Sequence, residues 1–93
     1  MIRNRYICIW ELKHGYMDVI IIEDELFLAE ELQNELSILD PTIRVVKRLS
    51  NVADSIAWLK ENSCDLIFSD IELTDGLSFS IFQDLNISIP VVF

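Results

Sequence analysis

The sequence predicts an α/β fold built on a doubly wound parallel sheet. Short β-branched runs alternate with helical patterns from residue 18 onward, which is typical of βαβ units. The first run, DVIII at residues 18–22, is too uniformly apolar for a strand with one face in water, so both of its faces should be covered. A length of 93 residues suits one domain, and a hydrophobic content of 52% with only two glycines indicates an ordered core.

Residues 26–39 follow this strand and are predicted to form an amphipathic helix. Their apolar side chains recur at three- and four-residue spacing, while acids and amides take the other face. The apolar positions are Leu28, Ala29, Leu32, Leu36 and Leu39. Asp40-Pro41 should end the helix, and residues 43–47 alternate enough to form an outer strand.

The second half of the chain repeats the same alternation. Ser50 or Asn51 can cap a second helix, with Asp54 in its first turn. Residues 65–69 should form the third strand, residues 77–85 a short helix, and residues 89–91 the start of a fourth strand. The side chains expected to face the core are Val52, Ile56 and Leu59 in the second helix, and Phe79, Ile81, Phe82 and Leu85 in the third.

Acidic side chains follow the first and third strands directly, in the stretches VIIIEDE and FSDIELTDG. Right-handed crossovers and a flavodoxin-like strand order of 2-1-3-4 place these two strands side by side. Their carboxyl ends then lie where the strand order reverses, which is where open α/β sheets bind ligands. We therefore expect Glu23, Asp24 and Asp70 to converge on one site.

Three carboxylates in one crevice repel one another, by roughly 3 kcal/mol per pair at ~5 Å and an effective dielectric of about 20. Mg²⁺ would relieve this repulsion, because it prefers hard oxygen ligands and is commonly held by carboxylates and phosphate. A carboxylate beside Mg²⁺ can also act as a nucleophile toward a phosphoryl group. Simpler roles exist, since Asp70 could cap a turn and Glu25 suits a first helical turn. Asp75 is interpreted as a turn former beside Gly76.

Composition excludes several function classes. The net charge of −9 would repel DNA, RNA and anionic lipid, so direct nucleic-acid contact is not expected. No apolar run approaches the length of a membrane span. Cys8 and Cys64 fit no zinc spacing and are interpreted as reduced thiols of a cytoplasmic protein. No phosphate-binding GxxxxGK[ST] loop occurs, which disfavours a GTPase.

Residues 18–93 resemble the receiver domain of two-component response regulators. The resemblance rests on the acidic pair Glu23-Asp24 at the end of the first strand and on Asp70 at the end of the third. The stretch DIELTDGLSF is similar to receivers attached to LytTR-type DNA-binding domains. The resemblance implies that Asp24 and Asp70 ligate Mg²⁺ through their side chains and Glu72 through its backbone carbonyl. It also implies that Glu23 holds a metal-bound water. Asp70 would accept a phosphoryl group from a histidine kinase, with no catalysis beyond self-phosphorylation and self-dephosphorylation.

A complete receiver continues beyond a point equivalent to Phe93 with a phosphate-sensing Ser or Thr, a helix, a lysine-bearing fifth strand and a final helix. We therefore expect residues 17–93 to be a receiver that lacks the fifth βα unit, with any LytTR effector and its transcriptional output outside these residues. Residues 1–16 are expected to be an extension outside the domain, with Met17 as the natural start. In a second hypothesis, residues 6–10 form a strand that covers the sheet.

The outer edge of the fourth strand should be prone to pairing, so we expect a marginal monomer or a homodimer formed through that edge. Two other functions stay open. The first is a pseudo-receiver that binds a protein partner without phosphotransfer. The second is a Mg²⁺-dependent phosphohydrolase with an aspartyl nucleophile, because Glu72 lies two residues after Asp70, where such enzymes place a second acid.

Overall fold

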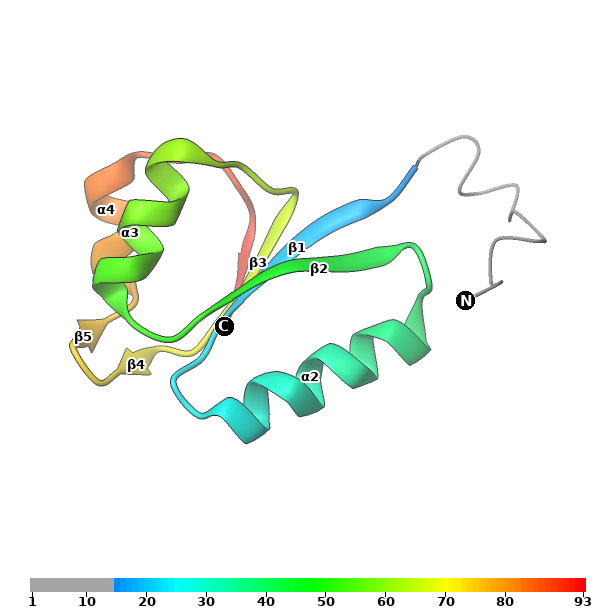
Figure 1. Ribbon diagram of the computed structural model, residues 1–93. Helices are drawn as coiled ribbons and strands as arrows, with labels where there is room; N and C mark the ends of the chain where they lie inside the picture. The colour runs from blue at the N-terminus through cyan, green and yellow to red at the C-terminus, as the bar shows by residue number, and fades with distance from the viewer. Residues whose placement is uncertain (1–14) are drawn as a thin grey trace.

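The computed structural model describes residues 15–93 and contains a four-stranded parallel sheet in the order β2-β1-β3-β6 (Figure 1). The order confirms the predicted 2-1-3-4 arrangement, because β6 is the fourth strand of this sheet along the chain. The strands are β1 (Met17–Ile22), β2 (Ile43–Leu49), β3 (Leu66–Ser69) and β6 (Val91–Val92). The central position of β1 brings its carboxyl end beside that of β3.

Helices cover both faces of the sheet. Helix α2 (Leu26–Leu39) lies on one face, and α3 (Val52–Glu61) and α4 (Phe79–Leu85) lie together on the other (Figure 1). The predicted bounds of the first helix are confirmed, and Asn51 caps α3 by accepting a 2.7 Å hydrogen bond from the amide of Asp54. A short antiparallel hairpin of β4 (Glu72–Leu73) and β5 (Gly76–Leu77) was not predicted.

The β-branched run of β1 forms the centre of the core, as predicted. Its residues from Val19 to Ile22 are at most 1% exposed. Ile20 and Ile22 pack in the cluster that includes α3 and α4, whereas Ile21 packs with Ala29 and Leu36 of α2. Both faces of this strand are therefore covered, which is the arrangement that a uniformly apolar strand requires.

Three predicted core positions are wrong. Leu28 and Leu39 are 46% and 77% exposed, because α2 packs through Ala29 and Leu36 and no second helix of the described residues lies beside it on this face. Phe79 is 44% exposed and rests edge-on against Phe93, with ring centroids 4.9 Å apart. The core is consequently deeper on the α3 and α4 face than on the α2 face.

Two further expectations concern residues outside the described range, namely the strand at residues 6–10 and the state of Cys8. Cys64 is buried and forms no disulfide with any described residue. Among residues 15–93, no helix has the length and apolar character needed to cross a bilayer.

Candidate functional site

The backbone of the sheet sets the position of the acidic residues. The amide of Asp70 donates a 2.9 Å hydrogen bond to the carbonyl of Ile22, which extends the pairing of β3 with β1 by one residue. The amide of Glu23 likewise donates to the carbonyl of Leu49 at 2.9 Å, at the end of β2. Glu23 and Asp70 are therefore held by the last hydrogen bonds of the sheet, while Asp24 lies in the bend that follows Glu23.

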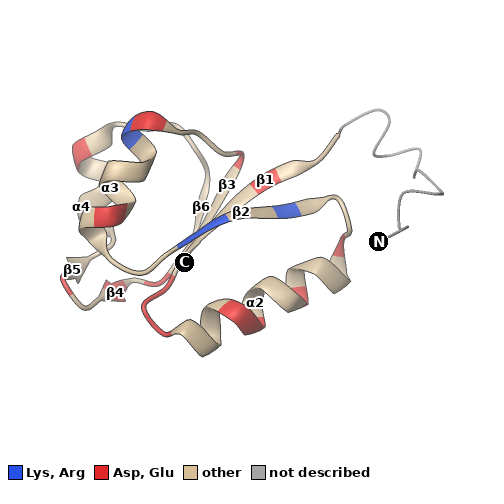
Figure 2. Ribbon diagram, in the orientation of Figure 1, with Lys and Arg blue, Asp and Glu red and all other residues tan. Residues whose placement is uncertain are grey.

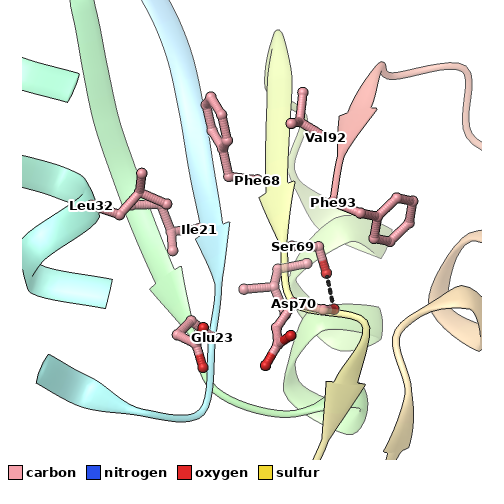
Figure 3. Close-up of a pocket in the computed structure, with 9 residues that line it drawn as sticks. Ile21, Glu23, Leu32, Phe68, Ser69, Asp70, Val92 and Phe93 are labelled. Carbon is pink, nitrogen blue, oxygen red and sulfur yellow. Dashed lines mark hydrogen bonds between the residues drawn. The ribbon is translucent and has the colours of Figure 1, made fainter. Parts of the chain in front are cut away.

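The structure brings Glu23, Asp24 and Asp70 together. Each offers a carboxylate oxygen, and these oxygens lie within 4.8 Å of one another. Figure 3 shows the carboxylates of Glu23 and Asp70 approaching each other across the ends of the two strands. The predicted convergence is present, and the identity of the ligand that these oxygens bind remains a prediction.

Glu23 is the acid of the cluster whose ionised form is disfavoured by its surroundings. Burial raises the pKa of the Glu23 carboxyl, and the neighbouring carboxylates of Asp24 and Asp70 raise it further. The amide of Glu25 opposes this shift by donating a 3.1 Å hydrogen bond to Oε2 of Glu23. A cation at the cluster would remove the repulsion that remains.

The carboxylate of Asp70 is oriented by its own neighbour. Oδ1 accepts a 2.8 Å hydrogen bond from the amide of Ile71, and the Asp70 carbonyl accepts a 2.9 Å bond from the hydroxyl of Ser69. Within the described residues, Oδ2 accepts no hydrogen bond. Because the side chain is also exposed, this second oxygen is available to a ligand or a reactant.

Glu72 lies two residues beyond Asp70, in β4, with an exposed side chain. Its carboxylate is not among the three that converge. The predicted contact of Glu72 uses the backbone carbonyl, and it remains a prediction.

Sequence reasoning missed the contact made by Asp75. Besides forming the hairpin turn, its carboxylate accepts hydrogen bonds from the amides of Val52 at 2.7 Å and Ala53 at 3.1 Å, at the start of α3. These two bonds lower the pKa of the Asp75 carboxyl, and the bond from the amide of Val52 has the larger effect. No local pattern could have revealed a cap supplied from more than twenty residues away.

Two hollows adjoin the acids. One is lined by Glu23 and Asp70 with the apolar side chains Ile21, Leu32 and Phe68, on the α2 face (Figure 3). The other is lined by Glu23 and Asp24 together with Arg48 of β2. Acidic residues outnumber basic residues in the described part of the chain, and the Lys and Arg residues of the sheet lie on β2 (Figure 2). Arg48 was not predicted, since strand residues give no sequence signal for a site.

No family model matches the chain. Two curated proteins are each 33% identical to it over 70 residues: the sensory transduction protein LytT of Enterococcus faecalis and the sensory transduction protein LytR of Staphylococcus epidermidis. The match covers 75% of this chain but 28% and 27% of those proteins. The chain thus spans little more than a quarter of the length of these relatives.

Solved structures share the fold. The REC domain of the Erythrobacter litoralis PhyR response regulator aligns with a TM-score of 0.73 and 23% identity, over 87% of this chain and 64% of that one. PhyR of Brucella abortus aligns with a TM-score of 0.73 and 23% identity, over 84% of this chain and 32% of that one. PhyR of Bartonella quintana, solved with the anti-sigma factor NepR, aligns with a TM-score of 0.73 and 27% identity, over 87% of this chain and 34% of that one.

Proposed function

Because this chain belongs to the receiver domains of response regulators, we propose that it is a phosphoacceptor with Asp70 as the residue that receives the phosphoryl group. The observation that carries the proposal is the cluster of carboxylate oxygens from Glu23, Asp24 and Asp70 within 4.8 Å. The cluster lies at the carboxyl ends of β1 and β3, the place where this fold binds ligands.

The proposed reaction is transfer from a phosphohistidine of a histidine kinase. The free Oδ2 of Asp70 attacks phosphorus while the phosphorus–nitrogen bond breaks. The histidine nitrogen keeps the electron pair of that bond and takes up a proton, and Asp70 becomes an acyl phosphate. The amide of Ile71, 2.8 Å from Oδ1, holds the carboxylate so that its other oxygen faces the reactant.

The residues present fit Mg²⁺, because the cluster consists of hard oxygen donors and carries an excess of negative charge. Asp24 and Asp70 would hold the ion through their side chains, Glu72 through its backbone carbonyl and Glu23 through a water molecule. When bound, the ion supplies positive charge that offsets the charge of the transferring phosphoryl oxygens. The chain's own acids would hold the ion beside Asp70, at the carboxyl ends of β1 and β3.

Phosphorylation would act by shifting the balance between two conformations of the domain. The proposed output is control of an effector, of which a LytTR-type DNA-binding domain is the candidate, with transcription regulation as the result. Homodimer formation and a cytoplasmic location are parts of the same proposal. The chain itself contacts no nucleic acid in this scheme, since its net charge of −9 would repel the phosphate backbone.

The test is intact-mass measurement after incubation with phosphoramidate and Mg²⁺. We expect one phosphoryl group on the wild-type chain and none on Asp70→Asn or in the presence of EDTA. Asp84→Asn is the matched control, because Asp84 is an exposed acid on α4 whose side chain makes no hydrogen bond or ion pair with any described residue. Equal phosphorylation of Asp70→Asn and wild type would refute the role of Asp70.

A second candidate function is a protein-binding module without phosphotransfer. It is favoured by the Bartonella quintana relative, whose structure was solved in complex with an anti-sigma factor. Absence of any phosphoryl addition to the wild-type chain, with Mg²⁺ binding also absent by calorimetry, would favour this function over the phosphoacceptor.

A further inference from the structure

The segment of residues 71–78, which we name the acceptor loop, is closed at its base. The amide of Ser78 donates a 2.9 Å hydrogen bond to the carbonyl of Ile71, and the hydroxyl of Ser78 lies 3.3 Å from the same oxygen. Ser78 is fully buried, so the donor groups of this closure are shielded from water, whereas Ile71 is 45% exposed. The same Ile71 supplies the amide that orients the carboxylate of Asp70.

The tip of the acceptor loop is fixed to a different element. The two oxygens of Asp75 accept one hydrogen bond each, from the amides of Val52 and Ala53. Among the described residues, these are the only side-chain hydrogen bonds that join residues 72–77 to α3. The base of the loop has one to α4, because the hydroxyl of Ser80 donates a 2.8 Å hydrogen bond to the carbonyl of Leu77. Leu73 adds an apolar anchor, since it is buried in the cluster shared with α3 and α4.

The first amides of α3 all have hydrogen-bond partners only when the carboxylate of Asp75 is included. A helix begins with amides that have no partner inside the helix. Asn51 accepts from the amide of Asp54 through its side chain and from that of Ser55 through its carbonyl, and neither bond reaches the first two amides. Asp75 takes those two. A carboxylate suits this place because the helix start carries partial positive charge.

Water could replace Asp75 as the partner of these amides, because the start of α3 is not buried. Water could not fix the loop. We infer that Asp75 is a positioning residue: it holds the acceptor loop against α3 and so fixes the Ile71 amide beside Asp70 and the carbonyl of Glu72. The inference rests on the proposed function of the Asp70 site. It assigns to the DG turn a role in shaping the phosphoacceptor and metal site.

The test compares three variants of the full chain. Asp75→Ala removes both hydrogen bonds from the tip of the loop, and Asp75→Asn keeps one acceptor oxygen. Asn51→Ala is the matched control, because it removes a cap from the same end of α3 and leaves the contact of Asp75 in place. A loss of helix stability alone would affect Asp75→Ala and Asn51→Ala alike.

The first readout is amide hydrogen exchange in the metal-free protein. We expect the amides of Ile71 and Ser78 to lose protection in Asp75→Ala and to keep it in Asn51→Ala, with Asp75→Asn between the two. Equal protection in Asp75→Ala and Asn51→Ala would overturn the inference. This readout does not depend on metal binding or phosphorylation.

The second readout is Mg²⁺ affinity by isothermal titration calorimetry. We expect Asp75→Ala to bind Mg²⁺ with an affinity lower by about tenfold or more, which is typical when a residue that orients metal ligands is lost. Asn51→Ala should bind Mg²⁺ as the wild-type chain does. Equal affinity of Asp75→Ala and wild type would overturn the inference. If the wild-type chain itself binds no Mg²⁺, the proposed function fails and the exchange comparison alone decides whether Asp75 positions the loop.

Discussion

The amide of Asp70 lies 2.9 Å from the carbonyl of Ile22, and this one hydrogen bond joins the two halves of the acidic cluster. Ile22 is the last residue of β1 and directly precedes Glu23-Asp24, while Asp70 directly follows β3. The register that pairs Ile22 with Ser69 therefore decides that the acids meet. A shift of one residue would turn the side chains of β3 to the opposite face and separate Asp70 from the pair.

We expect Asp70→Asn to stabilise the metal-free protein, because it removes one charge from a cluster of three carboxylates. A contact between exposed charges is worth about 1 kcal/mol or less, which corresponds to a rise in Tm of up to about 4–8 °C for a domain of this size. Thermal unfolding in EDTA measures the change. Mg²⁺ should then raise the Tm of the wild-type chain more than that of the variant.

Asp84→Asn controls for the change in net charge, since it alters the total equally at an exposed site on α4. An Asp70→Asn protein that melts at or below the wild-type temperature without Mg²⁺ would contradict the repulsion argument.

The raised pKa of Glu23 predicts a dependence of metal-free stability on pH. Because the folded chain holds this proton more tightly than the unfolded chain, the favourable contribution is complete below the ordinary value of 4.5 and is lost as the pH rises through the folded pKa. Glu23→Gln should therefore raise the Tm at neutral pH and leave it nearly unchanged at acid pH. Melting curves in EDTA across this range test the prediction.

Glu25→Gln is the matched control for Glu23→Gln, because Glu25 is an exposed acid two residues away and outside the cluster. A stabilisation by Glu23→Gln that is equal at every pH would show that ionisation of Glu23 is not its source.

The sheet order, the helix at residues 26–39 and the meeting of the acids follow from the sequence, because apolar periodicity and the handedness of crossovers fix them. The depth of each core position does not follow, as Leu39 shows. Periodicity places Leu39 on the inner side of α2, but its burial depends on a neighbouring element that the pattern of one helix cannot specify. Asp75 was predicted only as a turn residue for the same reason, since its partners Val52 and Ala53 lie on another element.

The lowered pKa of Asp75 predicts the opposite pH dependence from that of Glu23. The amides of Val52 and Ala53 favour its charged form, so its contribution is present above the ordinary value of 3.8 and is lost as the pH falls through the lower folded pKa. Asp75→Asn should thus lower the Tm at neutral pH, and the gap from wild type should close toward pH values well below 3.8. A gap that persists unchanged in acid would contradict this account.

The centre of the sheet should be sensitive to truncation. Ile67 of β3 is fully buried in the cluster with Ile81 of α4, so Ile67→Ala should cost about 2–5 kcal/mol in the free energy of unfolding. Ile38→Ala is the control, because Ile38 lies on α2 with 84% of its surface exposed. Urea denaturation of both variants measures the difference, and similar losses would contradict the described core.

Gly76 should tolerate no side chain, for a backbone reason. Its φ of +145° lies in a region that residues with a Cβ rarely adopt, and holding such a residue there costs about 1–3 kcal/mol. Space is not the obstacle, because a Cβ would meet only Cγ2 of Val52, at 3.8 Å. Gly76→Ala should therefore lower the free energy of unfolding by that amount in urea denaturation.

Since Gly76 adjoins Asp75, the strain should also weaken the contact of the acceptor loop with α3 and expose the Ser78 amide to exchange. Thr74→Ala, an exposed change on the other side of Asp75, should leave both measurements near wild type, and equal effects of the two variants would contradict the argument.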